Sequence, residues 1–150
     1  MLHVHLEQQM VANPPKQIRI DSVKVTRVSK EELVNLDRFY CEHQSEAWTQ
    51  LQFKVGSFYC VKQDGKIVSV AGTHVKTPQI AHLGNIVTDE AYRNRGFATA
   101  CTSILVANLS SKGRVISLFV RTENKPAIHI YEKLGFKKTR EIAFITAQKN

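Results

Sequence analysis

The chain of 150 residues is long enough for one domain with one core, and its 43% hydrophobic and 23% charged content is ordinary for a globular protein. Its apolar runs are shorter than the roughly 18 residues of a membrane span, and the N-terminus lacks the pattern of a secretory signal. Cys41, Cys60 and Cys101 are too widely spaced to suggest a disulfide framework or a zinc site. We therefore expect a cytoplasmic protein with reduced thiols and no metal.

The net charge of +8 is concentrated in the second half of the chain. Residues 1–75 contain 9 basic and 8 acidic residues, whereas residues 76–150 contain 12 basic and 5 acidic ones. This asymmetry favours an anionic ligand bound by the second half, and both a phosphorylated small molecule and a nucleic acid fit that description. A solvated basic surface without a ligand is the third interpretation.

The N-terminal stretch alternates apolar and polar residues, which predicts a half-buried strand beginning at Leu2. Asn13-Pro14-Pro15-Lys16 then predicts a linker. Residues 1–20 are thus expected to form an N-terminal strand and linker within a single domain spanning residues 1–150. The strand has two possible places to pair, either the sheet of its own chain or a partner chain in a homodimer.

A second strand is expected over residues 23–28. Ser29 is followed three residues later by Glu32, the form of a capping box, which predicts that a helix begins there. The region around Trp48 predicts a second short helix or a packed loop.

Residues 58–75 carry the clearest local pattern, because two runs of strand-forming residues flank Asp64-Gly65, a tight-hairpin signal. Further strands are expected over residues 80–88, 115–120 and 141–145, and helices over residues 96–110 and 124–135. The expected buried face of the first of these helices consists of Phe97, Cys101, Ile104, Leu105 and Leu109. This order of elements predicts an α+β (α/β layered) domain, with a mixed, mostly antiparallel sheet flanked by helices.

One loop, Arg93-Asn94-Arg95-Gly96-Phe97-Ala98, lies between a predicted strand and a predicted helix. A helix that begins at Gly96 leaves several main-chain N–H groups without intrahelical partners, and its macrodipole adds partial positive charge there. Because glycine has no Cβ, an anion can approach the backbone closely, and Arg93 and Arg95 add full charges. The loop therefore predicts a site for a phosphorylated ligand.

The same loop resembles the Q/R-x-x-G-x-G/A acyl-CoA signature of the GNAT superfamily of N-acetyltransferases, with Ala98 as an allowed variant at the last position. A later segment, Asn124-x-x-Ala127-x-x-x-Tyr131-Glu132-Lys133-Leu134-Gly135-Phe136, resembles the N-x-x-A-x-x-x-Y-x-x-x-G-F segment of that family. The resemblance covers roughly residues 23–146. The runs AGTHV, GNIVT and YRNRGFAT are similar to the branch described as FR-forty-seven-like.

The resemblance implies acetyl-CoA as co-substrate, with its pyrophosphate on the loop and its thioester carbonyl polarised by an N–H group of the preceding strand. Tyr131 is the implied general acid that protonates the departing thiolate, with a core residue as the alternative. Asn124 would bond the pantetheine or adenosine portion, with a helix cap as the alternative. The cofactor-binding residues implied in this way are Ile86, Val87, Thr88, Arg93, Asn94, Arg95, Gly96, Phe97, Ala98, Thr99, Asn124 and Ala127.

The function implied is transfer of an acetyl group to a primary amine by direct attack in a ternary complex. An acyl-enzyme is disfavoured because Cys101 falls on the predicted buried face. The residues eligible to accept the proton of the amine are His74, His82, Glu42 and Glu46, and Asn85 could orient a water. The acceptor is left open between a small amine and a protein.

Two other functions compete with this one. The chain could bind CoA as a regulatory or sensor domain without turnover. It could also be a basic nucleic-acid-binding module, although no recognised nucleic-acid motif supports that reading.

Overall fold

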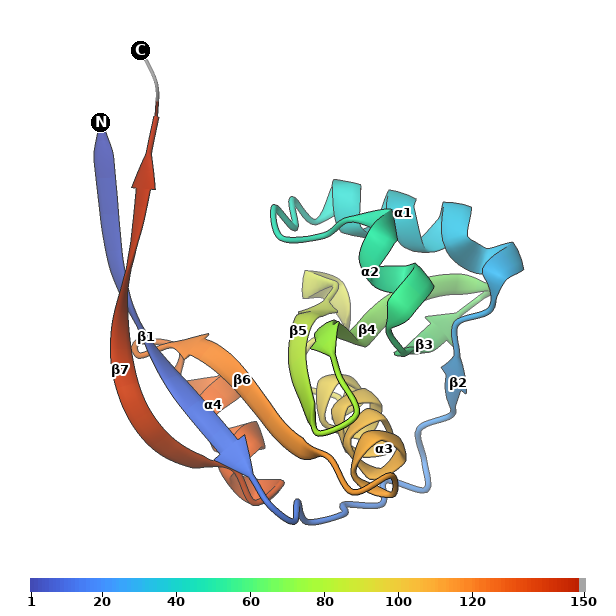
Figure 1. Ribbon diagram of the computed structural model, residues 1–150. Helices are drawn as coiled ribbons and strands as arrows, with labels where there is room; N and C mark the ends of the chain where they lie inside the picture. The colour runs from blue at the N-terminus through green and yellow to red at the C-terminus, as the bar shows by residue number, and fades with distance from the viewer. Residues whose placement is uncertain (149–150) are drawn as a thin grey trace.

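Seven strands form one sheet in the computed structural model, which describes residues 1–148 (Figure 1). In chain order the strands are β1 (Leu2–Ala12), β2 (Val25–Arg27), β3 (Phe58–Gln63), β4 (Lys66–Lys76), β5 (Ile80–Thr88), β6 (Val115–Arg121) and β7 (Lys137–Ala147). Their order across the sheet is β2-β3-β4-β5-β6-β1-β7. The β5–β6 pair is parallel and the other neighbouring pairs are antiparallel. The predicted mixed, mostly antiparallel sheet is confirmed.

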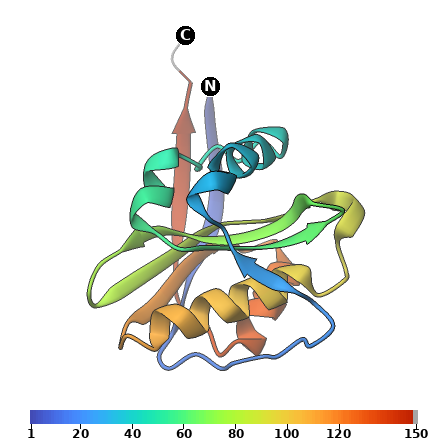
Figure 2. The ribbon, with the colours of Figure 1, turned by 90° about the vertical axis from the view of Figure 1, so that its right-hand side faces the viewer.

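Helices cover both faces of the sheet. They are α1 (Leu33–Glu42), α2 (Gln50–Val55), α3 (Phe97–Ser110) and α4 (Lys125–Lys133), with short 3-10 turns at Lys30–Glu32 and Glu90–Tyr92. Figure 2 shows α3 on one side of the sheet and α1 and α2 on the other. Within residues 1–148 we find no helix with the length and apolarity needed to cross a membrane.

The N-terminal strand joins the sheet of its own chain, between β6 and β7. It pairs with β6 from Glu7 to Ala12 and with β7 from Leu2 to Val11. Met10 and Ala12 are each 1% exposed and belong to the main core cluster, which explains why the strand is held there. Beyond Glu7, towards the N-terminus, β1 continues with β7 alone, and the two project as the ribbon seen on the left of Figure 1.

Local predictions are confirmed where the signal is contained in a few residues. Ser29 and Glu32 form the expected capping box, followed by a 3-10 turn and then α1. Asp64 and Gly65 have φ values of 50° and 77°, the positive pair that a type I′ hairpin requires. The region after α1 contains the short helix α2, which is one of the two alternatives predicted for it.

One expectation about α3 is wrong. Ile104 is 41% exposed, whereas Cys101, Leu105 and Leu109 are buried as predicted. Small and polar residues of α3, including Thr102 and Ser103, are buried instead. The reason is that α3 lies across several strands while the N-terminal linker covers another side of it, with Ser103 donating a hydrogen bond to the Ile18 carbonyl (2.7 Å).

Candidate active site

The site begins where β5 and β6 part. The two strands pair from Ile80↔Val115 to Leu83↔Leu118, and from there they diverge to their ends at Thr88 and Arg121. A cavity of about 440 Å³ opens at this divergence. Of the residues predicted for the site, Ile86, Asn124 and Tyr131 line it together.

A β-bulge at Asn85 causes the change of direction in β5. Between the pairs Gly72↔Gly84 and Val70↔Val87, two residues of β5 face a single residue of β4. Asn85 has a left-handed φ of 53° and is only 7% exposed. Bulges of this kind bend a strand and are common next to active sites.

Both helices on that face hold the bulge. The Tyr40 hydroxyl of α1 donates a 2.7 Å hydrogen bond to the Asn85 carbonyl. The Asn85 side-chain amide donates to Gln52 Oε1 of α2 at 2.8 Å, and Ser45 Oγ donates to Asn85 Oδ1 at 3.4 Å. The position of Ile86, the next residue on the cavity wall, therefore depends on contacts from distant parts of the sequence.

The loop predicted to bind an anion, residues 93–98, follows β5 after the short 3-10 turn at Glu90–Tyr92. Asn94 and Gly96 have φ values of 61° and 77°, and Gly96 is the N-cap of α3 with no side-chain hydrogen bond to cap the helix. The first main-chain bond of the helix runs from Ala100 N–H to the Gly96 carbonyl, so the N–H groups of residues 97–99 precede the intrahelical ladder. This arrangement fits a pyrophosphate group, because an anion supplies the acceptors that a capping side chain does not.

The two arginines of the loop are exposed and are held by main-chain carbonyls. Arg93 Nε donates to the Thr88 carbonyl and Arg95 to the Ala91 carbonyl, both at 3.4 Å. The Arg95 guanidinium also lies 5.2 Å from the centre of the Tyr92 ring. These contacts keep both charges beside the N-terminus of α3.

Tyr131 projects from α4 into the cavity wall and is 7% exposed. Burial raises the pKa of Tyr131 to about 12, so its hydroxyl stays protonated at neutral pH. Its backbone carbonyl accepts from Phe136 N–H (3.0 Å) at the end of the helix, which fixes the base of the side chain. The residue thus has both properties considered for it, a packed ring and a proton to donate.

Asn124 is a helix cap. Its Oδ1 accepts from Ala127 N–H at 3.3 Å at the start of α4, while the residue also lines the cavity. The Ala127 N–H therefore already has a partner within the protein. Thr88 likewise has a partner, because its hydroxyl is 2.8 Å from Ser69 Oγ.

Only some of the residues eligible to accept the proton of the amine line the cavity. His74, His82 and Asn85 line the cavity, whereas Glu42 and Glu46 are exposed and do not belong to its lining. His82 Nδ1 lies 2.9 Å from Ser117 Oγ on β6. Burial, together with nearby His74, lowers the pKa of His82 to about 4, and burial lowers the pKa of His74 as well. Both imidazoles are therefore neutral at pH 7.

Cys101 does not reach the cavity. It lies on the buried face of α3 and is fully buried, and burial raises the pKa of its thiol to about 12. Because a thiolate is the nucleophilic form of cysteine, this environment is unsuited to an acyl-enzyme.

Sequence reasoning missed the residues that β1 and β7 bring to the cavity, namely Glu7 and Phe144. It also missed Phe119 of β6. The alternation in residues 2–7 predicted a strand, but nothing local predicted that this strand would lie beside β6.

The profile of the Acetyltransferase (GNAT) family matches residues 28–136. An N-alpha-acetyltransferase from Sulfurisphaera tokodaii is 26% identical over 155 residues, covering 86% of each chain. The [Ribosomal protein bS18]-alanine N-acetyltransferase of Escherichia coli is 30% identical over 103 residues, covering 68% of this chain and 64% of that protein.

A solved structure from the same family has the same fold. The structure of a putative GNAT acetyltransferase from Novosphingobium aromaticivorans superposes with a TM-score of 0.81 at 25% identity, covering 95% of this chain and 64% of that one. The chain spans about half to two thirds of the length of several curated relatives that it matches. The chain belongs to the GNAT family of acetyltransferases, and its assignment to the FR-forty-seven-like branch stays a prediction.

Proposed function

We propose that this protein transfers the acetyl group of acetyl-CoA to a primary amine, by direct attack of the amine in a ternary complex. The observation that carries the proposal is the cavity at the divergence of β5 and β6, which brings Ile86 and Tyr131 together, while the uncapped N-terminus of α3 follows β5 along the chain. Acetyl-CoA supplies an activated thioester.

The residues of the chain have separate tasks in this proposal. The N-terminus of α3, with Arg93 and Arg95, binds the pyrophosphate, and the strand at residues 86–88 provides an N–H group for the developing oxyanion. Tyr131 donates its proton to the sulfur as the C–S bond breaks and the N–C bond forms. The proton released by the amine, carried by water in the cavity, restores the Tyr131 hydroxyl, so the proton balance closes.

Membership of the family does not identify the acceptor of the acetyl group. The relatives include an N-alpha-acetyltransferase and a [ribosomal protein bS18]-alanine N-acetyltransferase. The shared chemistry is a primary amine, and this is the acceptor class we propose here.

Calorimetry with acetyl-CoA followed by a thiol-release assay over amines and peptides tests the function. Tyr131→Phe is expected to lower kcat by about 10²-fold or more while leaving the Kd for acetyl-CoA within about twofold, because the hydroxyl acts on the departing sulfur. Tyr59→Phe on β3, a half-buried tyrosine outside the cavity lining, is the matched control. Unchanged turnover in Tyr131→Phe would refute the role of its hydroxyl. Binding without turnover of any amine would favour the sensor function instead.

A further inference from the structure

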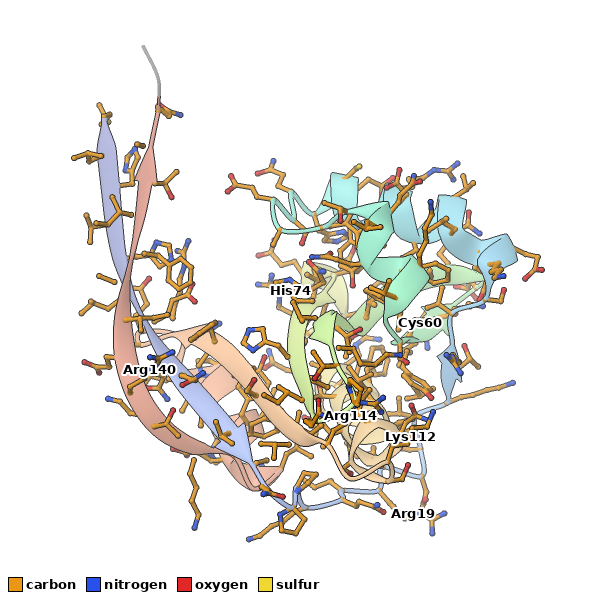
Figure 3. The ribbon with its side chains drawn as sticks, in the orientation of Figure 1. Arg19, Cys60, His74, Lys112, Arg114 and Arg140 are labelled. Atoms are coloured by element: carbon orange, nitrogen blue, oxygen red, sulfur yellow. The ribbon has the colours of Figure 1, made fainter. Side chains whose placement is uncertain are left out.

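The sheet has an uncovered face beside the reaction end of the cavity. Helices α1 and α2 pack on β4, and Figure 1 shows the β1–β7 ribbon standing apart from them on the other side of β5 and β6. The cavity spans this gap, because its lining includes Ala47 after α1 and Phe144 on β7. In Figure 3, His74 lies on the side of β4 and β5 that faces the ribbon.

The strand register determines which side chains face this gap. Met10 and Ala12 pair with Leu118 and Ile116 and point into the core, so the alternate residues of β1 and β6 point the other way. Glu7 and Phe119 belong to this second set.

His5 also belongs to this second set, and its partner on β7 is Phe144. The ribbon therefore contributes an acidic residue and aromatic residues to one continuous wall.

Aromatic rings follow one another across this wall. The centroid of His82 lies 4.8 Å from that of Phe119, and Phe119 lies 5.9 Å from Phe144. The His5 ring stacks on Phe144 at 5.6 Å with an interplanar angle of 7°. Four strands thus contribute to a single aromatic row, which begins next to the divergence of β5 and β6 and ends on the ribbon.

Charged side chains also line the cavity, with Glu7 on β1 paired to Arg121 on β6. Glu7 has the only carboxylate among the described residues that line the cavity, and its Oε1 lies 3.0 Å from His5 Nε2. Arg121 also lines the cavity, but its side chain is 58% exposed and lies 3.9 Å from the Glu123 carboxylate. The wall therefore combines flat apolar rings with a carboxylate that attracts cations.

We propose that the acceptor is an amine that carries an aromatic ring and is cationic in solution, with the ring lying against Phe119 and Phe144 and with Glu7 attracting the ammonium group to the cavity. The amine releases one proton to water before it reacts, so the neutral form attacks the thioester, and its second proton leaves as the N–C bond forms. This inference rests on the proposed acetyl transfer and specifies its substrate class. Aromatic pairs provide selectivity over an aliphatic group of equal size through their ring geometry. The row lines the same cavity as Ile86 and Tyr131, so in this proposal a ring that lies on the row leaves the amino group free to reach the reaction end.

Thiol release with wild-type protein tests the inference without any variant. The probes are 2-phenylethylamine, 2-cyclohexylethylamine as the non-aromatic control of equal length, 1,4-diaminobutane, and a tetrapeptide with a free N-terminal alanine. We expect kcat/KM for 2-phenylethylamine to exceed that for the cyclohexyl amine by about 2- to 10-fold and to exceed the values for the other two probes.

Substitutions in the aromatic row test whether it causes the preference for an aromatic amine. Phe119→Leu and Phe144→Leu should each lower kcat/KM for 2-phenylethylamine by about 2- to 10-fold while leaving the KM for acetyl-CoA unchanged. Ile145→Ala is the control, because Ile145 neighbours Phe144 on β7 but points to the opposite side and is 64% exposed.

The carboxylate is tested in the same assay. Glu7→Gln should raise the KM for the amine by about 2- to 5-fold, whereas Glu141→Gln on the other side of the ribbon should not.

The outcomes separate this inference from the function on which it rests. Faster turnover of the diamine, the peptide or the cyclohexyl amine, or no turnover of 2-phenylethylamine, overturns the aromatic acceptor while acetyl-CoA binding and any amine turnover still support the transferase. Absence of acetyl-CoA binding in calorimetry overturns both. Leucine variants that match wild type would also overturn the role of the aromatic row.

Discussion

The hydrogen bond from Tyr40 to Asn85 offers a direct test of how the fold shapes the active site. Tyr40 is fully buried, and burial raises the pKa of its hydroxyl well above the usual value, so it donates at any working pH. Its ring stacks on Trp48 with centroids 4.6 Å apart, a contact that phenylalanine can keep. Tyr40→Phe therefore removes one hydrogen bond and little else.

The expected cost follows from the burial of the acceptor. The Asn85 carbonyl would lose its partner in the protein interior, which destabilises a protein by about 1–3 kcal/mol. For a chain of this length, each kcal/mol lowers Tm by about 2–4 °C. The same bond also stabilises the left-handed conformation of the bulge. If about 1.4 kcal/mol of the lost free energy is needed to restore that conformation when acetyl-CoA binds, the Kd for acetyl-CoA rises about tenfold.

Urea unfolding followed by Trp48 fluorescence measures the stability, and calorimetry measures the affinity. Tyr59→Phe is the control, since within residues 1–148 the Tyr59 hydroxyl makes no hydrogen bond and the side chain is half-buried. If Tyr40→Phe unfolds at the same urea concentration as Tyr59→Phe and binds acetyl-CoA like wild type, the bulge does not depend on this bond.

Three further results are expected. Gly96→Ala and Gly113→Ala both place a Cβ at a φ near 77°, so each should lose about 1–2 kcal/mol of stability, but only Gly96→Ala should weaken acetyl-CoA binding in calorimetry. Equal affinities would argue against the anion site. His82 has its pKa lowered from 6.5 to about 4, so the unfolded chain binds the proton first and stability falls as pH drops from 6.5 towards 4. In urea unfolding, the free energy of unfolding should fall by on the order of 1–2 kcal/mol between pH 7 and pH 5, and by less in His82→Gln. If the free energy of unfolding of that variant falls with pH as steeply as in wild type, His82 is not the group responsible. Cys101→Ala should keep kcat within about twofold, whereas a collapse of turnover would indicate an acyl-enzyme.

The family profile covers only part of the residues that line the cavity. The family profile matches residues 28–136, which include Ile86, Asn124 and Tyr131 but neither β1 nor β7. Of the residues that we propose for acceptor selection, Glu7 and Phe144 lie outside the matched segment, whereas Phe119 lies within it. Membership of the family therefore rests on a segment that excludes β1 and β7, which supply part of the acceptor wall that we propose.

The sequence alone determined the features whose causes lie within a few residues. Asp64-Gly65 predicted the hairpin because both positions need positive φ, and Ser29 with Glu32 predicted the helix start through reciprocal capping. Gly96, between an apolar strand pattern and a helical one, predicted the start of α3, whose N-cap it is. The order of these elements was enough to predict the fold class.

Only the tertiary structure decided how distant segments meet. The pairing of β1 between β6 and β7 brings Glu7 beside Arg121, more than a hundred residues along the chain, and no local pattern encodes a choice among strand edges. The left-handed Asn85 depends on Tyr40 and Gln52, which arrive from separate helices. Local chemistry therefore predicted the loop proposed to bind acetyl-CoA, whereas long-range pairing placed the strands β1 and β7 that form part of the cavity wall.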